Sequence, residues 1–189
     1  SVARDNVICK KYKNELGKAN NELFAQFFMR IYKEIQNCIL GSFGTLKYVN
    51  SSNFIKFREN FKAKFLKGFI CPAYTFDNLE NKQFPIGFLV WNLGEKVDIK
   101  KVKVQIFNKN NKRINKKNFY ANKRYINQWI SNFIDKKSEA KALLDTRGTD
   151  FQNQRYIALK SQNFVITAHS TGLKLTKYNI IPMSVYFSI

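Results

Sequence analysis

The sequence predicts an α/β fold in its first half, followed by a basic extension made mostly of β-strands. Apolar residues recur alternately at helix and strand spacing as far as Trp91. The last two apolar runs of this part are joined by a loop without a helical period. Beyond Gly94 the sequence becomes basic and strand-like, so we expect one domain at residues 1–94 and a β-rich extension at 95–189 that can pack back on it.

Two helices are predicted in the first half. Ser1–Gly17 is polar and has no apolar period, so we expect an irregular start. The first helix runs from about Asn21 to Ile35, and either Asn20 or Asn21 can cap it. Its apolar positions are Leu23, Phe24, Phe27, Phe28, Ile31 and Ile35. Ser51 or Ser52 can cap the second helix, whose apolar face carries Phe54, Phe57, Phe61 and Phe65.

Three apolar runs bounded by glycine or proline predict strands at Asn37–Gly44, Phe69–Cys71 and Pro85–Trp91. A helix joins the first two, so they should run parallel through a crossover connection. The loop Tyr74–Phe84 joins the last two and has no helical period. We therefore expect these two strands to pair antiparallel as a long-looped hairpin.

The extension begins with a half-exposed strand at Lys100–Phe107, in which Val102, Val104 and Ile106 share one face. The elements expected after it are a basic turn-rich stretch at Asn108–Lys117, a short helix at Tyr125–Ile134 carrying Trp129 and Phe133, a polar loop at Arg147–Asn153, and short strands at Tyr156–Leu159, Phe164–Ala168 and Val185–Phe187.

The charge balance favours a polyanionic partner. The 189 residues include 33 Lys and Arg but 13 Asp and Glu, a net charge of +20. Such a charge is typical of nucleic-acid contact, although a genome rich in Lys, Asn, Ile and Phe codons also produces basic proteins. No apolar run is long enough to span a membrane, and the lysines do not gather on one amphipathic helix. The scattered cysteines Cys9, Cys38 and Cys71 favour reduced thiols in the cytoplasm.

No catalytic, metal-binding or cofactor-binding site is predicted within this chain. His169 is the single histidine, so neither a zinc site nor a Ser-His-Asp or Cys-His arrangement can be assembled. The segment Gly41-Ser-Phe-Gly44 is more typical of a tight turn than of a phosphate-binding loop. Asp77 is the carboxylate of most interest, but one carboxylate makes no catalytic constellation.

A basic segment between Lys96 and Arg124 is the candidate nucleic-acid-binding region. Aromatic residues lie between its cations, and Asp98 is its only acidic residue. Lysines can neutralise phosphates while aromatic rings stack on bases, or the rings can fill a core beneath a solvated surface. The candidate residues are Lys96, Lys100, Lys101, Lys103, Lys109, Lys112, Arg113, Lys116, Lys117, Lys123 and Arg124.

An ordered series of short strings resembles a family of bacterial adenine-specific DNA methyltransferases of restriction–modification systems. The strings are Gly17-Lys-Ala-Asn-Asn-Glu-Leu-Phe-Ala-Gln-Phe-Phe28, Asn37-Cys-Ile-Leu40, Leu46-Lys-Tyr-Val-Asn50, Asn53-Phe-Ile-Lys-Phe-Arg58, Thr75-Phe-Asp-Asn78 and Phe84-Pro-Ile-Gly-Phe88. The similarity runs through most of the chain and includes Asp150-Phe-Gln-Asn153. Each string is weak alone, and the ordered set is fairly specific.

The resemblance implies that residues 1–94 are the C-terminal part of a Rossmann-like methyltransferase domain. In that family this region follows the catalytic Asn-Pro-Pro-Tyr loop, and the final strand of the sheet is an antiparallel insertion. The glycine-rich motif for S-adenosylmethionine lies further upstream, and neither motif occurs here. The chain then resembles an expressed fragment or the remnant of a split gene, inactive alone, with DNA and the missing N-terminal part as partners.

The resemblance also implies a role for the loop Tyr74–Phe84. Such enzymes flip the target adenine out of the duplex, and this loop commonly brings an aromatic ring against it. Phe76 matches best by position, with Tyr74 and Phe84 as alternatives, and Phe76 can equally close the hairpin as a core residue. Two other functions stay open: a stand-alone basic nucleic-acid-binding module, and a subunit that completes a partner chain.

Overall fold

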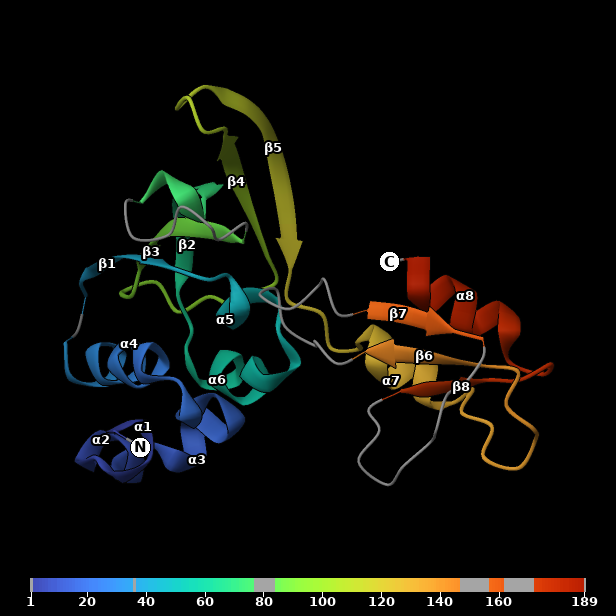
Figure 1. Ribbon diagram of the computed structural model, residues 1–189. Helices are drawn as coiled ribbons and strands as arrows, with labels where there is room; N and C mark the ends of the chain where they lie inside the picture. The colour runs from blue at the N-terminus through green and yellow to red at the C-terminus, as the bar shows by residue number, and fades with distance from the viewer. Residues whose placement is uncertain (1, 36, 77–83, 147–156, 162–171, 189) are drawn as a thin grey trace. The chain divides into compact units, whose positions relative to one another are not determined.

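The structure, a computed structural model, describes residues 2–35, 37–76, 84–146, 157–161 and 172–188 (Figure 1). The chain divides into two compact units, Ser1–Lys123 and Arg124–Ile189. This division lies well beyond Gly94, where the sequence changes in character. The reason is that strands from both sides of Gly94 pair in one sheet.

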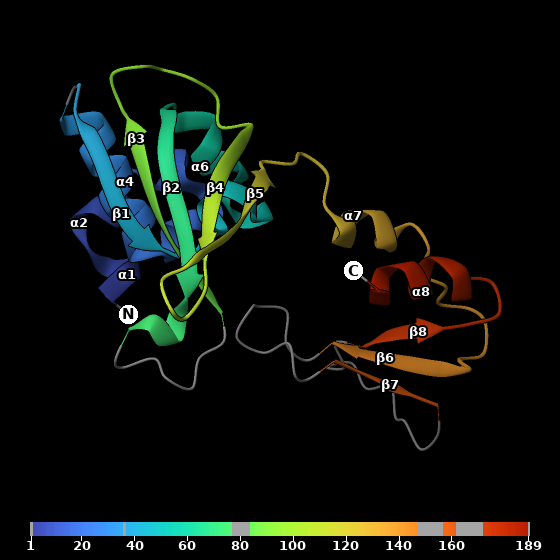
Figure 2. The ribbon, with the colours of Figure 1, turned by 90° about the horizontal axis from the view of Figure 1, so that it is seen from above.

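The first unit is built around a mixed sheet with the strand order β1-β3-β2-β4-β5 (Figure 2). The strands are β1 (Ile39–Gly44), β2 (Lys64–Pro72), β3 (Pro85–Asn92), β4 (Lys101–Phe107) and β5 (Arg113–Tyr120). β2 and β4 pair parallel, and the remaining neighbours pair antiparallel. The predicted α/β class is confirmed at this level.

β3 lies between β1 and β2 and runs antiparallel to both. The predicted hairpin is therefore confirmed, and within it Phe69 lies opposite Phe88. β1 and β2 run in the same direction, as the helical connection between them predicts. They do not pair with each other, because β3 is inserted between them.

The two faces of this sheet differ, as β3 illustrates. Leu89 and Trp91 are almost completely buried, whereas Phe88 and Val90 are half-buried. Successive side chains of a strand point to opposite faces, so one face is covered and the other is not. The helices of the first unit lie on one side of the sheet (Figure 1), and we call the uncovered side the open face.

The helices of the first unit are α1 (Val2–Asp5), α2 (Val7–Lys11), α3 (Lys13–Leu16), α4 (Leu23–Glu34), α5 (Lys47–Asn50) and α6 (Ile55–Asn60), with short 3-10 helices η1 (Gly17–Asn21), η2 (Ser52–Phe54) and η3 (Ala73–Thr75). α4 confirms the first predicted helix. Its predicted cap is wrong, because Asn20 and Asn21 belong to η1 and Glu22 precedes α4 without a side-chain cap.

The expected irregular start is also wrong, because α1, α2 and α3 form there. The Asn6 side chain caps α2 by accepting a hydrogen bond from the Cys9 N–H at 2.8 Å. Tyr12 and Leu16 are buried in the core. Helices of about one turn are too short to display an apolar period, so tertiary contacts rather than pattern stabilise them.

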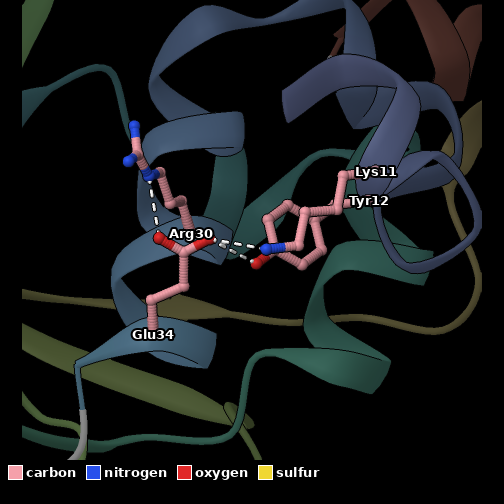
Figure 3. A network of polar contacts seen from close by, with 4 residues as sticks. All are labelled: Lys11, Tyr12, Arg30 and Glu34. Atoms are coloured by element: carbon pink, nitrogen blue, oxygen red, sulfur yellow. Dashed lines mark hydrogen bonds and ion pairs between the residues drawn. The ribbon is translucent and has the colours of Figure 1, made fainter. Parts of the chain in front are cut away.

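A network around Glu34 connects this start to α4 (Figure 3). Lys11 and the Tyr12 hydroxyl donate to Glu34 Oε1 at 2.8 Å and 3.0 Å. Arg30 donates to Glu34 Oε2 at 2.9 Å. One carboxylate at the end of α4 therefore holds donors from two separate parts of the chain.

The second predicted helix begins as expected, since Ser51 Oγ accepts a hydrogen bond from the Asn53 N–H at 3.3 Å. Phe54, Phe57 and Phe61 are buried against the sheet as their spacing predicts. The prediction that Phe65 lies on this helix is wrong, because α6 ends at Asn60 and Phe65 belongs to β2. The turn α5, which carries buried Tyr48, was not predicted. Trp91 Nε1 donates to the Tyr48 hydroxyl at 3.0 Å.

The strand predicted at Lys100–Phe107 is β4, with Val102 and Val104 buried as expected. The predicted turn-rich stretch Asn108–Lys117 is correct only for residues 108–112, because Arg113 begins β5. β5 is paired on one edge, and nearly all its side chains are exposed. An exposed strand needs no apolar alternation, which is why its sequence resembles a loop.

The second unit contains a small antiparallel sheet with the order β7-β6-β8. Its elements are α7 (Ile126–Ser131), β6 (Ala142–Thr146), β7 (Ile157–Lys160), β8 (Leu173–Leu175) and α8 (Ile180–Ser188). α7 confirms the predicted helix with Trp129, although Phe133 lies past its end. β7 matches the strand expected at Tyr156–Leu159 over its described residues.

The strand predicted at Val185–Phe187 is wrong, because these residues lie in α8. Short apolar runs do not distinguish strand from helix, and Pro182 is tolerated in the first turn. The loop expected at Arg147–Asn153 and the strand at Phe164–Ala168 lie outside the described residues. Within the described ranges, no helix has the length and apolar character required to cross a membrane.

Candidate nucleic-acid interface

Of the three aromatic loop candidates, Phe76 lines a pocket at the end of β2. Phe76 directly follows η3 and lies on the pocket wall. Tyr74 lies within η3 and is exposed, and Phe84 is half-buried and accepts a hydrogen bond from the Ala73 N–H through its backbone oxygen at 2.9 Å. Asp77 and residues up to 83 lie outside the described residues.

The pocket has a volume of about 370 Å³ and is mostly aromatic. We call it the aromatic pocket, and its lining residues are Phe43, Phe69, Cys71, Thr75, Phe76, Phe107 and Asn111. Its volume is near the lower end of the roughly 300–1,000 Å³ typical of small-molecule sites. A single planar heterocycle is therefore an occupant of suitable size.

Four phenylalanine rings meet around this pocket. Phe43 and Phe76 meet edge to face, with ring centroids 5.6 Å apart. Phe69 lies edge to face with Phe43 at 6.2 Å and with Phe107 at 5.7 Å. Phe43 remains 55% exposed, so this cluster is open to solvent rather than closed as a core. Open ring faces and edges of this kind can receive another aromatic ring.

Sequence reasoning named Phe76 as a candidate but did not name Phe43, Phe69 and Phe107, which line the same pocket. These three lie in strands, where an apolar side chain is normally assigned to the core. The signal that could have found Phe69 is a run of adjacent apolar positions in β2 and in its partner β3, such as Phe69-Ile70 and Phe88-Leu89, which indicates two apolar faces.

The aromatic pocket lies at the carboxyl ends of the parallel strands. β1, β2 and β4 share one direction, and they end at Gly44, Pro72 and Phe107. Phe43 and Cys71 are next to the ends of their strands. In open α/β sheets, ligands bind outside the carboxyl ends of the strands, so this edge is where a functional site is expected.

The chemistry of the pocket suits a neutral aromatic ligand. Its described lining residues include no carboxylate and no cation, and Thr75 and Asn111 supply polar groups. Burial raises the pKa of the Cys71 thiol, so it stays protonated at neutral pH. A protonated thiol is a poor nucleophile, which makes Cys71 a wall of the pocket rather than a reactive group.

The basic candidates divide into three places. Lys96 Nζ donates to the Leu93 backbone oxygen at 2.8 Å and lies 4.0 Å from the Tyr32 ring centroid. The Lys96 ammonium is therefore bound within the first unit, at the loop after β3. Lys100, Lys123 and Arg124 flank the hairpin of β4 and β5, and all are exposed. The hairpin itself carries Lys101, Lys103, Lys109, Lys112, Arg113, Lys116 and Lys117.

The β4–β5 hairpin, residues 101–120, contains no acidic residue. Its cations are exposed, and among the residues that the structure describes no carboxylate forms an ion pair with any of them. The nearby acids are engaged elsewhere, Asp98 with Lys62 and Glu95 with Lys64. The hairpin therefore presents uncompensated positive charge, which attracts phosphates.

Metal chemistry gains no support from the described part of the chain, where no cluster of His, Cys, Asp or Glu could hold an ion. His169 lies outside the described residues. No family model matches this chain, and neither a curated protein nor a solved structure is significantly similar to it.

Proposed function

We propose that this chain is the rear part of the catalytic fold of a DNA adenine methyltransferase, where it contributes DNA binding and capture of the target base. The observation that carries the proposal is the aromatic pocket, in which Phe76 meets Phe43 at the carboxyl edge of the sheet. An adenine extruded from the duplex is a planar neutral ring, and stacking on aromatic side chains offsets the loss of its neighbours.

The strand order supports this proposal. In the methyltransferases that the sequence resembles, the final strand of the sheet is an antiparallel insertion. β3 has the corresponding relationship to its neighbours, since it runs antiparallel between the parallel strands β1 and β2.

Among the three aromatic candidates, Phe76 is favoured for the face that meets the base. Phe76 lines the aromatic pocket and contacts Phe43. Tyr74 is exposed beside the pocket and Phe84 is half-buried, and neither is among the residues that line it.

S-adenosylmethionine does not fit this pocket. The cofactor carries a positive sulfonium and a ribose, which need carboxylate and amide partners, whereas the described lining is mainly phenylalanine. We therefore assign the cofactor to another part of the enzyme or to a partner chain. The free thiols Cys9, Cys38 and Cys71 fit the reducing cytoplasm proposed for such an enzyme.

The test compares two DNA duplexes that differ at one adenine, either paired or placed opposite an abasic site. The chain should bind the unpaired adenine more tightly, by roughly 5- to 150-fold, because stacking contributes about 1–3 kcal/mol per base. Phe76→Leu should abolish this preference. Phe27→Leu, at an exposed position of α4, is the matched control and should retain it. Fluorescence anisotropy measures the affinities of the three proteins for the two duplexes.

Equal affinity of Phe76→Leu and the unmodified chain for the unpaired adenine would contradict base capture. A chain that binds both duplexes equally, with a steep salt dependence, would instead favour the stand-alone nucleic-acid-binding module, which needs the hairpin but not the pocket. A subunit that completes a partner chain would bind DNA well only together with that partner.

A further inference from the structure

The pairing register divides the hairpin cations between the two faces of the sheet. Residues directly opposite in a ladder point to the same face. Phe69 lies on the open face and pairs with Gln105, so Lys101, Lys103 and Phe107 share that face. On β5, Lys116 pairs with Gln105 and Tyr120 with Lys101, so both share that face. The register shifts between Ile106 and Phe107, so the pairing of Phe107 with Arg113 does not fix the direction of Arg113.

Burial agrees with this assignment. Val102 and Val104, between the two lysines of β4, are almost completely buried on the covered face. Lys117 pairs with Val104 and therefore points to the covered side, away from Lys116. The neighbouring lysines of β5 thus have opposite directions although both are exposed.

We infer that Lys101, Lys103 and Lys116, here called the open-face track, hold the sugar–phosphate backbone of a single DNA strand whose base enters the aromatic pocket. The inference rests on the proposed function and names a second part of the same interface. Phe107 joins the two parts, because it lines the pocket and is the last residue of β4.

Charge complementarity determines the occupant of this face. The track is a row of exposed cations for which no carboxylate partner exists among the described residues. Aromatic residues lie at both ends of it, Phe107 at the end of β4 and Tyr120 beside Lys101, whose Nζ is 6.0 Å from the Tyr120 ring centroid. Cations that follow a backbone and rings that stack on bases are the combination that single-stranded nucleic acids require.

The dimensions suit a short strand. β4 has seven residues, and six steps of about 3.3 Å give a track of roughly 20 Å. That length corresponds to about six nucleotides at the stacked spacing of 3.4 Å, and to fewer when the strand is unstacked. A strand of this length can run from the pocket along β4 and β5.

The experiment measures how the affinity for a single-stranded DNA of about 12 nucleotides depends on salt. Combining Lys101→Ala, Lys103→Ala and Lys116→Ala should flatten the log–log slope by about 2, since each phosphate contact in a single strand contributes about 0.7. The control combines Lys10→Ala, Lys13→Ala and Lys33→Ala, which remove equal charge from exposed positions of α2, α3 and α4. The control should keep the slope.

A second comparison separates the faces at single-residue resolution. Lys116→Ala should flatten the slope by about 0.7, and Lys117→Ala should change it less, because only Lys116 faces the track. Equal effects of the two substitutions, or of the two triple variants, would show that net charge alone acts and would overturn the inference.

Two further outcomes test the identity of the occupant. Tighter binding of a duplex than of the single strand would overturn the single-strand assignment, and tighter binding of the same sequence as RNA would overturn the DNA assignment. Failure here is distinguishable from failure of base capture. If the triple variant keeps its slope while Phe76→Leu loses the preference for an unpaired adenine, the track is wrong and the proposed function remains.

Discussion

At the scale of single residues, Glu34 is a surface carboxylate that accepts hydrogen bonds from three side chains. Hydrogen bonds from Lys11, then Arg30 and Tyr12, lower the pKa of its carboxyl from 4.5 to about 2. A carboxyl whose pKa is depressed in the folded protein stabilises that state above its unfolded pKa. This contribution is lost as the pH falls through the folded pKa, so the window lies between about 4.5 and 2.

Glu34→Gln should therefore remove part of the acid dependence of stability. The melting temperatures of the variant and the unmodified chain should differ most above pH 4.5 and converge toward pH 2. The difference should be small, because the carboxylate is on the surface and solvent screens the pairs. Carbon NMR of the Glu34 carboxyl gives an independent check, and a titration midpoint near 4.5 would contradict the network.

The residues around the pocket show what sequence alone can predict. Phe76 became a candidate because the family resemblance implies an aromatic ring against the target base in the loop Tyr74–Phe84. Phe43 did not, because a phenylalanine in an apolar strand is usually core. The difference arises from the layer arrangement: helices cover one face of the sheet, and sequence pattern does not reveal which strand positions remain uncovered.

At the scale of elements, the β2–β3 pair depends on a close backbone approach at Gly68. A Cβ at this position would lie 2.7 Å from the Phe88 backbone oxygen. Gly68→Ala should therefore push the strands apart and lower the free energy of unfolding by about 1–3 kcal/mol. Urea unfolding monitored by circular dichroism measures this change.

Gly44 is the matched control, because nothing lies within 4 Å of a Cβ built on it. Gly44→Ala should be neutral or stabilise by about 0.4–1 kcal/mol through the lower entropy of the unfolded chain. Equal unfolding free energies for the two variants would show that β2 can shift to accept a side chain, and the close approach would then have no energetic role.

Elements differ in how well the sequence predicts them, for a physical reason. α4 and β4 are half-buried, so burial imposes a period of 3.6 or 2 on their residues. β5 is exposed on both faces, and α1 to α3 are single turns, so no period is imposed. The placement of β3 was partly predictable, because loop length indicates a hairpin without showing which strand will border its other edge.

At the scale of the whole molecule, positive charge is concentrated in the first unit. Residues 1–123 contain 24 Lys and Arg against 9 Asp and Glu, a net +15, and residues 124–189 contain 9 against 4, a net +5. These two values account for the net +20 of the chain. The unit with the aromatic pocket and the hairpin therefore supplies most of the attraction for a polyanion.

We expect the whole chain not to bind S-adenosylmethionine. Binding of its nucleoside needs a glycine-rich loop against a strand end and a carboxylate for the ribose hydroxyls. The sequence has no such loop, and the described residues of the aromatic pocket include no carboxylate. Titration calorimetry of the chain with the cofactor should give no saturable heat, while titration with DNA should confirm that the sample is active.

Saturable cofactor binding in the micromolar range would contradict the proposed role, because a rear part of the fold would then hold the methyl donor as well as the base. It would also require polar partners that the pocket does not offer. The opposite result, DNA binding without cofactor binding, is expected if different parts of the enzyme hold the target base and the methyl donor. Under the proposed function, the aromatic pocket and the hairpin engage the nucleic acid, and the methyl donor is held by residues outside them.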